Sequence, residues 1–176
     1  MNKKTLILGG VRSGKSRLAE RLATESQLPV TYIATATALD EEMHKRIALH
    51  RVRRPDNWIV IEEPLQLASV LYQQATRERC ILVDCLTLWL TNLLTAQDTS
   101  QFLYEREALL STIPTLTGRI ILVSNETNMG ITPMGELSRR YCDEAGRLHQ
   151  DLAQCCEQVI LTVAGLPHIL KEHPHE

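Results

Sequence analysis

A glycine-rich stretch near the amino terminus, residues 9–16, constrains this chain more than any other part of its sequence. It reads GGVRSGKS and matches the pattern G-x-x-x-x-G-K-[ST], in which backbone N–H groups of a loop surround nucleotide phosphates. An apolar run at residues 5–8 precedes it and an apolar stripe at helical spacing follows it, a context that a chance glycine-rich turn would lack. The predicted nucleotide-binding residues of this loop are Gly9, Gly10, Val11, Arg12, Ser13, Gly14, Lys15 and Ser16.

Three side chains are predicted to carry the chemistry around this loop. Lys15 would reach the outer phosphates as a catalytic residue, and the Ser16 hydroxyl would ligate Mg²⁺. Asp84 ends the apolar run at residues 80–83, where P-loop proteins place a carboxylate that acts on the metal. An acidic residue at the end of a buried strand is common and by itself weak evidence. The glycine-rich loop upstream is what makes a metal role for Asp84 the favoured interpretation. Ser16 and Asp84 are therefore the predicted metal residues.

The rest of the chain alternates between apolar strand patterns and helical stripes, which predicts an α/β P-loop NTPase fold. We expect a mostly parallel sheet with helices on both faces. The strands are expected at residues 5–8, 29–34, 58–61, 80–84, 119–126 and 159–163, and the helices at 17–26, about 39–52, 65–75, 86–94, 102–111 and 136–157. Polar residues follow most of the strands, so they should converge at one sheet edge, where ligands bind. Residues 165–176 are expected to form a frayed, solvated tail.

The composition bounds the classes of function. The 176 residues suit one domain, and we expect residues 1–176 to form a single nucleotide-binding domain. The formal net charge of -2 and the 4% aromatic content favour neither nucleic acid nor a membrane surface as a partner. No membrane span or signal peptide is visible, and the five cysteines form no C-x-x-C, so we expect reduced thiols in a cytoplasmic protein.

A series of further motifs resembles one family, the bifunctional adenosylcobinamide kinase / adenosylcobinamide-phosphate guanylyltransferases of cobalamin synthesis. The resemblance covers nearly the whole chain. Its motifs in the first half are the loop itself, Tyr32-Ile33-Ala34-Thr35, Asp40-x-Glu42-Met43, Arg46-Ile47-x-x-His50-Arg51 and Arg54-Pro55-x-x-Trp58. Those in the second half are Asp84-Cys85-Leu86-Thr87, Thr91-Asn92-Leu93-Leu94, Ser124-Asn125-Glu126, Gly130-Ile131-x-Pro133 and Asp143-x-Ala145-Gly146-Arg147. Plain P-loop kinases share only the first motif.

This resemblance implies a two-step reaction. A nucleoside triphosphate, ATP or GTP, first phosphorylates the aminopropanol hydroxyl of adenosylcobinamide, and GTP then donates GMP to a histidine that passes it to the cobinamide phosphate. The matching histidine is His50, which the resemblance makes the second catalytic residue. The matching nucleotide contacts outside the loop are Ala34, Thr35, Arg51, Val52, Arg53, Arg54, Glu62 and Asp84. The resemblance also implies a small-molecule corrinoid substrate and a homo-oligomer, a trimer.

The residues by themselves leave alternatives open. His50 by itself fits a half-buried helix residue, the arginines fit a solvated helix end, and Glu62 fits a plain strand end as well as a contact to guanine or ribose. The chain could then be a simple P-loop small-molecule kinase or a nucleotide-switched regulatory module. The sequence also departs from the family pattern in three places. A second glycine is usual near Asn128, asparagine is usual at His149, and an acidic segment is usual where this chain has Cys155-Cys156-Glu157.

Overall fold

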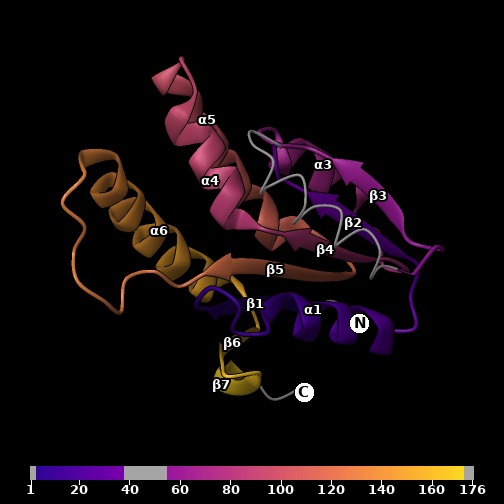
Figure 1. Cartoon of the computed structure of the whole chain (residues 1–176). Coiled ribbons are helices and arrows are strands. Elements are labelled where there is room, and N and C mark those ends of the chain that lie inside the picture. The colour runs from indigo at the N-terminus through magenta and orange to yellow at the C-terminus, as the bar shows by residue number, and fades with distance from the viewer. Residues whose placement is uncertain (1–2, 38–54, 173–176) are drawn as a thin grey trace.

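The computed structural model describes residues 3–37 and 55–172 of the chain (Figure 1). Seven strands form one sheet in the order β3-β2-β4-β5-β1-β6-β7. The strands are β1 (Lys3–Gly9), β2 (Val30–Ala34), β3 (Ile59–Glu62), β4 (Cys80–Asp84), β5 (Arg119–Asn125), β6 (Gln158–Val163) and β7 (Leu166–Glu172). All neighbouring pairs are parallel except β6 and β7. The prediction of a mostly parallel sheet is confirmed.

Helices cover both faces of this sheet, as predicted. They are α1 (Lys15–Glu25), α3 (Leu67–Gln74), α4 (Leu86–Thr95), α5 (Thr99–Thr112) and α6 (Glu136–Cys155), with a short 3-10 helix η1 (Ile113–Thr115). The apolar stripe of α1 packs with Tyr32 and Trp58 on one face, while α3, α4, α5 and α6 share the larger core on the other face. Figure 1 shows α1 and α4 on opposite sides of the sheet. Their burial follows the helical spacing of apolar residues that the sequence shows.

The predicted elements differ from the observed ones mainly at their ends. The helix predicted at residues 102–111 begins at Thr99, because the Asp98 side chain accepts a hydrogen bond from the Ser100 N–H and caps the helix. The helix predicted at 136–157 ends at Cys155, and the helix expected at about 39–52 lies outside the described residues. No helix in the described ranges is long and apolar enough to cross a membrane.

The prediction of a frayed tail after Gly165 is wrong for residues 166–172. They form β7, which pairs antiparallel with β6. Ala164 and Gly165 both have positive φ values, 52° and 80°, which is the backbone geometry of a two-residue hairpin turn. The sequence did not indicate this strand, since its side chains are mostly exposed on an edge and show no alternation of apolar and polar residues.

Candidate active site

The glycine-rich loop joins the carboxyl end of β1 to the start of α1, as the motif predicts. Gly9 and Gly14 have positive φ values of 154° and 100°, where a side chain is strained. A Cβ on Gly9 would lie 2.4 Å from the carbonyl oxygen of Thr162 in β6, so the loop tolerates no side chain there. The structure therefore explains Gly9 by close backbone approach and Gly14 by its positive φ. The N-terminal end of α1 points its backbone dipole at the loop, which favours bound anions.

Lys15 is buried, although its side chain is charged. Its ammonium group donates a hydrogen bond to the carbonyl oxygen of Gly10, 2.6 Å away. Burial lowers the pKa of Lys15, while the nearby Cys85 and Asp84 act in the opposite direction. The lysine thus lies between the loop and the end of β4. At that position the Lys15 ammonium can contact the phosphates of a bound nucleotide and stay close to the Asp84 carboxylate.

The loop is also tied to the β6–β7 hairpin. The N–H of Gly165 donates to the carbonyl oxygen of Ser13 at 2.9 Å. The Ser13 hydroxyl is buried and has no hydrogen-bond partner within the described residues, as expected for a donor that serves a ligand. Val11 and Arg12 lie exposed on the rim of the loop, and Arg12 has a positive φ of 55°. The predicted loop residues are therefore brought together around one concave backbone.

Asp84 lies at the carboxyl edge of the sheet, in register with two other predicted site residues. Ala34 of β2 is the register partner of both Asp84 and Glu62. One Asp84 oxygen, Oδ2, accepts a hydrogen bond from the Tyr32 hydroxyl at 3.1 Å. The sequence did not single out Tyr32 as a site residue, because a strand pattern does not say which side chain reaches a neighbouring strand.

The oxygens of this edge suit Mg²⁺. Mg²⁺ is usually held by one or two protein oxygens together with substrate phosphates and water. Half-buried Ser16 and Asp84 offer a hydroxyl and a carboxylate of that kind. The described residues contain no cluster of three or more histidine, cysteine or acidic side chains that could hold a metal without a nucleotide. The donor set fits a metal that arrives with the nucleotide.

Thr35 has a structural role in the site. Its buried hydroxyl donates to the carbonyl oxygen of Cys85 at 2.6 Å and accepts from the Cys85 N–H at 3.0 Å. The Asn92 side chain of α4 donates to the carbonyl oxygens of Thr35 and Pro64. These bonds fix the ends of β2 and β4 relative to each other.

Several predicted site residues fall in the part of the chain that the structure leaves undescribed. His50, Arg51, Val52, Arg53 and Arg54 lie outside the described residues. Glu62 ends β3 with an exposed side chain at the same sheet edge as Asp84. The roles of these residues remain predictions.

A buried polar cluster at the end of β5 was not predicted. The Nε2 atom of His149 in α6 lies 2.8 Å from the Ser124 hydroxyl, and its Nδ1 atom lies 3.6 Å from a carboxylate oxygen of Glu126. Burial lowers the pKa of His149, and the Glu126 charge opposes this shift. The N–H of Glu126 donates to the carbonyl oxygen of Gly9 at 2.9 Å, so the cluster touches the phosphate loop.

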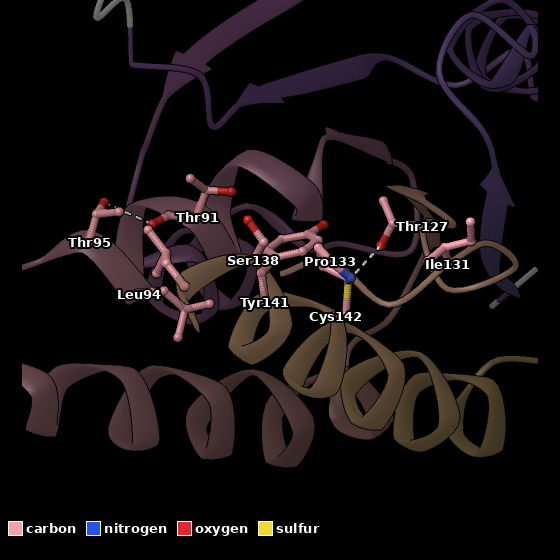
Figure 2. Close-up of a pocket in the computed structure, with 10 residues that line it drawn as sticks. Thr91, Leu94, Thr95, Thr127, Ile131, Pro133, Ser138, Tyr141 and Cys142 are labelled. Carbon is pink, nitrogen blue, oxygen red and sulfur yellow. Dashed lines mark hydrogen bonds between the residues drawn. The ribbon is translucent and has the colours of Figure 1, made fainter. Parts of the chain in front are cut away.

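A groove of about 450 Å³ opens beside this cluster between α4, the β5–α6 loop and the first turns of α6. Figure 2 shows Thr127 and Ile131 at one end, Thr91 and Thr95 at the other, and Tyr141 between them. We call it the α4–α6 groove. Apolar side chains, among them Leu94 and Pro133, alternate with hydroxyl groups along it.

Fold and loop together define the class: the chain is a P-loop nucleotide-binding protein. Solved structures of that class share the fold at low identity. The flagellar accessory protein FlaH of Methanocaldococcus jannaschii is 18% identical, covers 97% of this chain and 79% of its own, and superposes with a TM-score of 0.52. A solved ATPase domain is 16% identical, covers 91% of this chain and 69% of its own, and also has a TM-score of 0.52.

The family within that class follows from closer relatives. The model of the family described as "Cobinamide kinase / cobinamide phosphate guanyltransferase" matches residues 5–170. The bifunctional adenosylcobalamin biosynthesis protein CobP of Pseudomonas aeruginosa is 64% identical over 97% of this chain and 99% of its own length. The corresponding CobU protein of Escherichia coli is 36% identical over 92% and 96%. The chain belongs to this enzyme family, which confirms the resemblance.

Proposed function

We propose that this chain phosphorylates adenosylcobinamide with ATP or GTP and then transfers GMP from GTP to the product, giving adenosylcobinamide-GDP and pyrophosphate. The observation that best supports this proposal is the position of Lys15, which is buried in the loop beside Asp84 at the end of β4. That arrangement suits a triphosphate whose reacting group lies at the carboxyl edge of the sheet.

In the kinase step, the aminopropanol hydroxyl of the corrinoid attacks the γ-phosphorus of the nucleotide. The bond to the bridging oxygen breaks, the nucleoside diphosphate leaves, and the hydroxyl proton passes to a base or to water. Backbone N–H groups of residues 9–16 and the Lys15 ammonium stabilise the charge on the transferred group. Glu62, Ala34 and Thr35 lie along the same edge and are proposed to contact the nucleoside part.

In the guanylyl step, we propose His50 as the nucleophile. A neutral imidazole nitrogen attacks the α-phosphorus of GTP, and pyrophosphate leaves with the electrons of the broken P–O bond. A phosphate oxygen of the corrinoid phosphate then attacks the same phosphorus, and cleavage of the P–N bond restores His50. Arg51, Arg53 and Arg54 follow in the chain, and their guanidinium groups are proposed to stabilise the departing pyrophosphate.

Mg²⁺ is the proposed metal, bound by Ser16 and near Asp84 together with the phosphates. When bound, it neutralises charge that builds up on the phosphate oxygens. Tyr32 supports this assignment, because its hydrogen bond fixes the orientation of the Asp84 carboxylate. The other Asp84 oxygen would then be available to balance the charge of the metal.

We also propose that the protein is a trimer and that it is located in the cytoplasm. The resemblance implies a trimer, and exposed Leu166, Ile169 and Leu170 on the edge strand β7 support a contact between copies. All five cysteines are free thiols, which suits the reducing cytoplasm. Light scattering during gel filtration would test the trimer.

One experiment separates the proposed function from its competitors. The purified protein is incubated with Mg²⁺ and GTP labelled at the α-phosphate, then denatured and separated from free nucleotide. Label that stays on the protein, and leaves when cobinamide phosphate is added before denaturation, is the expected result. A simple kinase would retain no label while still phosphorylating cobinamide. A nucleotide-switched module would do neither and would only hydrolyse GTP slowly.

A further inference from the structure

The α4–α6 groove lies next to the phosphate loop, although α1 and the groove-forming helices cover opposite faces of the sheet. Thr127 of the groove directly follows Glu126, whose N–H is bonded to the Gly9 carbonyl oxygen. In the first turn of α4, which follows the neighbouring strand β4, the Thr87 hydroxyl accepts a hydrogen bond from the Asn125 N–H at 2.7 Å. A molecule in the groove would therefore lie beside the ends of β4 and β5.

The wall of the groove is held in place by specific contacts. The Asn128 side chain donates to the carbonyl oxygen of Cys142 in α6 at 2.9 Å, and its N–H donates to Glu126 at 2.7 Å. These bonds join the β5–α6 loop to α6 on one side and to the phosphate edge on the other. The groove is thus a built feature on the same edge as the site.

The lining alternates apolar carbon with hydroxyl groups. Thr91, Thr95, Thr127, Ser138 and Tyr141 supply hydroxyls that can both donate and accept. Burial raises the pKa of Tyr141 to about 12, so its hydroxyl stays protonated at neutral pH. Ile131, which lines the opening, is 99% exposed. Such a surface suits a large apolar ring that carries many primary amides at its edge.

We infer that the α4–α6 groove holds the edge of the corrinoid acceptor, with its amides on the hydroxyls and its aminopropanol arm directed past Glu126 toward the phosphate loop. This inference rests on the proposed function and adds the location of the acceptor to it. A volume of about 450 Å³ takes one edge of a corrinoid and leaves the rest outside. Exposed Met129 and Met134 of the loop then cover the outer part of the ring.

A second copy of the chain is the competing occupant. Exposed apolar residues at the opening would also suit a subunit contact. The hydroxyl lining and the link through Glu126 to Gly9 favour the acceptor, because both chemical steps need it within reach of the phosphates.

The test compares two groove variants with matched controls in the full-length protein. Ser138→Trp fills the groove from an exposed position on α6, and Ile131→Ser removes the apolar rim. Ser111→Trp and Leu103→Ser place the same changes on exposed positions of α5 that do not line the groove. KM for cobinamide and for nucleotide is measured in the kinase reaction, and cobinamide binding without nucleotide is measured by equilibrium dialysis.

The expected result is a rise of at least about tenfold in the KM and Kd for cobinamide in Ser138→Trp. The rise should be about threefold to tenfold in Ile131→Ser, which loses apolar surface that the bound corrinoid would cover. The KM for nucleotide should change less than about twofold, and both controls should match the wild type. Unchanged cobinamide constants in both groove variants would overturn the inference while leaving the proposed function intact. Subunit dissociation of both groove variants at unchanged cobinamide affinity would assign the groove to a second copy. A wild-type protein that neither binds nor phosphorylates cobinamide would refute the proposed function and this inference together.

Discussion

The Tyr32 hydroxyl and the Asp84 carboxylate are joined by a hydrogen bond of 3.1 Å across neighbouring strands of the sheet. The bond fixes the acid at the edge where the phosphate loop begins. A carboxylate held by one oxygen keeps the other for a second task, and here that task is the proposed Mg²⁺ site.

Asp84→Asn should therefore raise the Mg²⁺ concentration needed for half-maximal kinase rate by about tenfold or more, because the charge that balances the metal is lost. Nucleotide affinity measured without metal should change little. Tyr32→Phe keeps the carboxylate and loses only its orienting bond, so its shift should be about fivefold, as expected for about 1 kcal/mol. Mg²⁺ titrations of Asp84→Asn that overlay those of the wild type would contradict the metal assignment.

Lys15→Ala should abolish both activities, with a loss of about a hundredfold or more in each kcat/KM. The buried Lys15 ammonium is proposed to stabilise the negative charge on the phosphates in both steps. Such a contact contributes several kcal/mol in the transition state. Arg21→Ala on the same helix removes an exposed cation paired with Glu25 and should leave both rates unchanged. Kinase activity near the wild-type level in Lys15→Ala would argue against a shared phosphate site.

His50→Asn should separate the two activities. The kinase step uses the substrate hydroxyl as nucleophile and should continue, whereas GMP labelling and formation of the GDP-linked product should be lost. The wild-type adduct should be labile in acid and stable in base, because protonation of a phosphoramidate nitrogen makes it a good leaving group. Its formation should fall below pH of about 6.5, where imidazole becomes protonated.

The control for this prediction is His44→Asn, which should keep both activities. If folded His50→Asn protein still took up label from GTP covalently, another histidine would be the nucleophile, with His44 the first to test. A parallel decline of both activities together with lower thermal stability would instead assign His50 a packing role.

His149 should make the stability of the fold depend on pH. Its pKa is lowered by burial in the native state, so the unfolded chain binds a proton more readily. The free energy of unfolding should therefore fall as pH drops below about 6.5, and the part due to His149 should be absent in His149→Asn. Urea titrations between pH 5 and pH 8, a range of about one unit or more on either side of 6.5, measure this difference.

At pH 8 the same variant should be less stable by about 1–3 kcal/mol if asparagine does not replace the contact to the Ser124 hydroxyl. His168→Asn on the exposed strand β7 is the matched control and should keep the wild-type pH profile. A His149→Asn profile parallel to the wild type between pH 5 and pH 8 would show that His149 is not the titrating group.

The sequence by itself determined the phosphate loop and the parallel α/β sheet. Both follow from local rules: glycines where the backbone must approach a ligand, an apolar strand before them and a helical stripe after them. Asp84 was also predictable, because the carboxyl ends of parallel strands meet at one edge whatever the strand order. The motifs along the chain then identified the family.

Only the tertiary structure decided which side chains meet across that edge. Strand order and the rotation of α6 decide the Tyr32–Asp84 bond, the two bonds between Thr35 and Cys85, and the position of His149 beside Glu126. The strand β7 and the α4–α6 groove were missed for the same reason. A short edge strand and a groove between a helix and a distant loop leave no periodic signal in the sequence, since they arise from contacts between segments far apart in the chain.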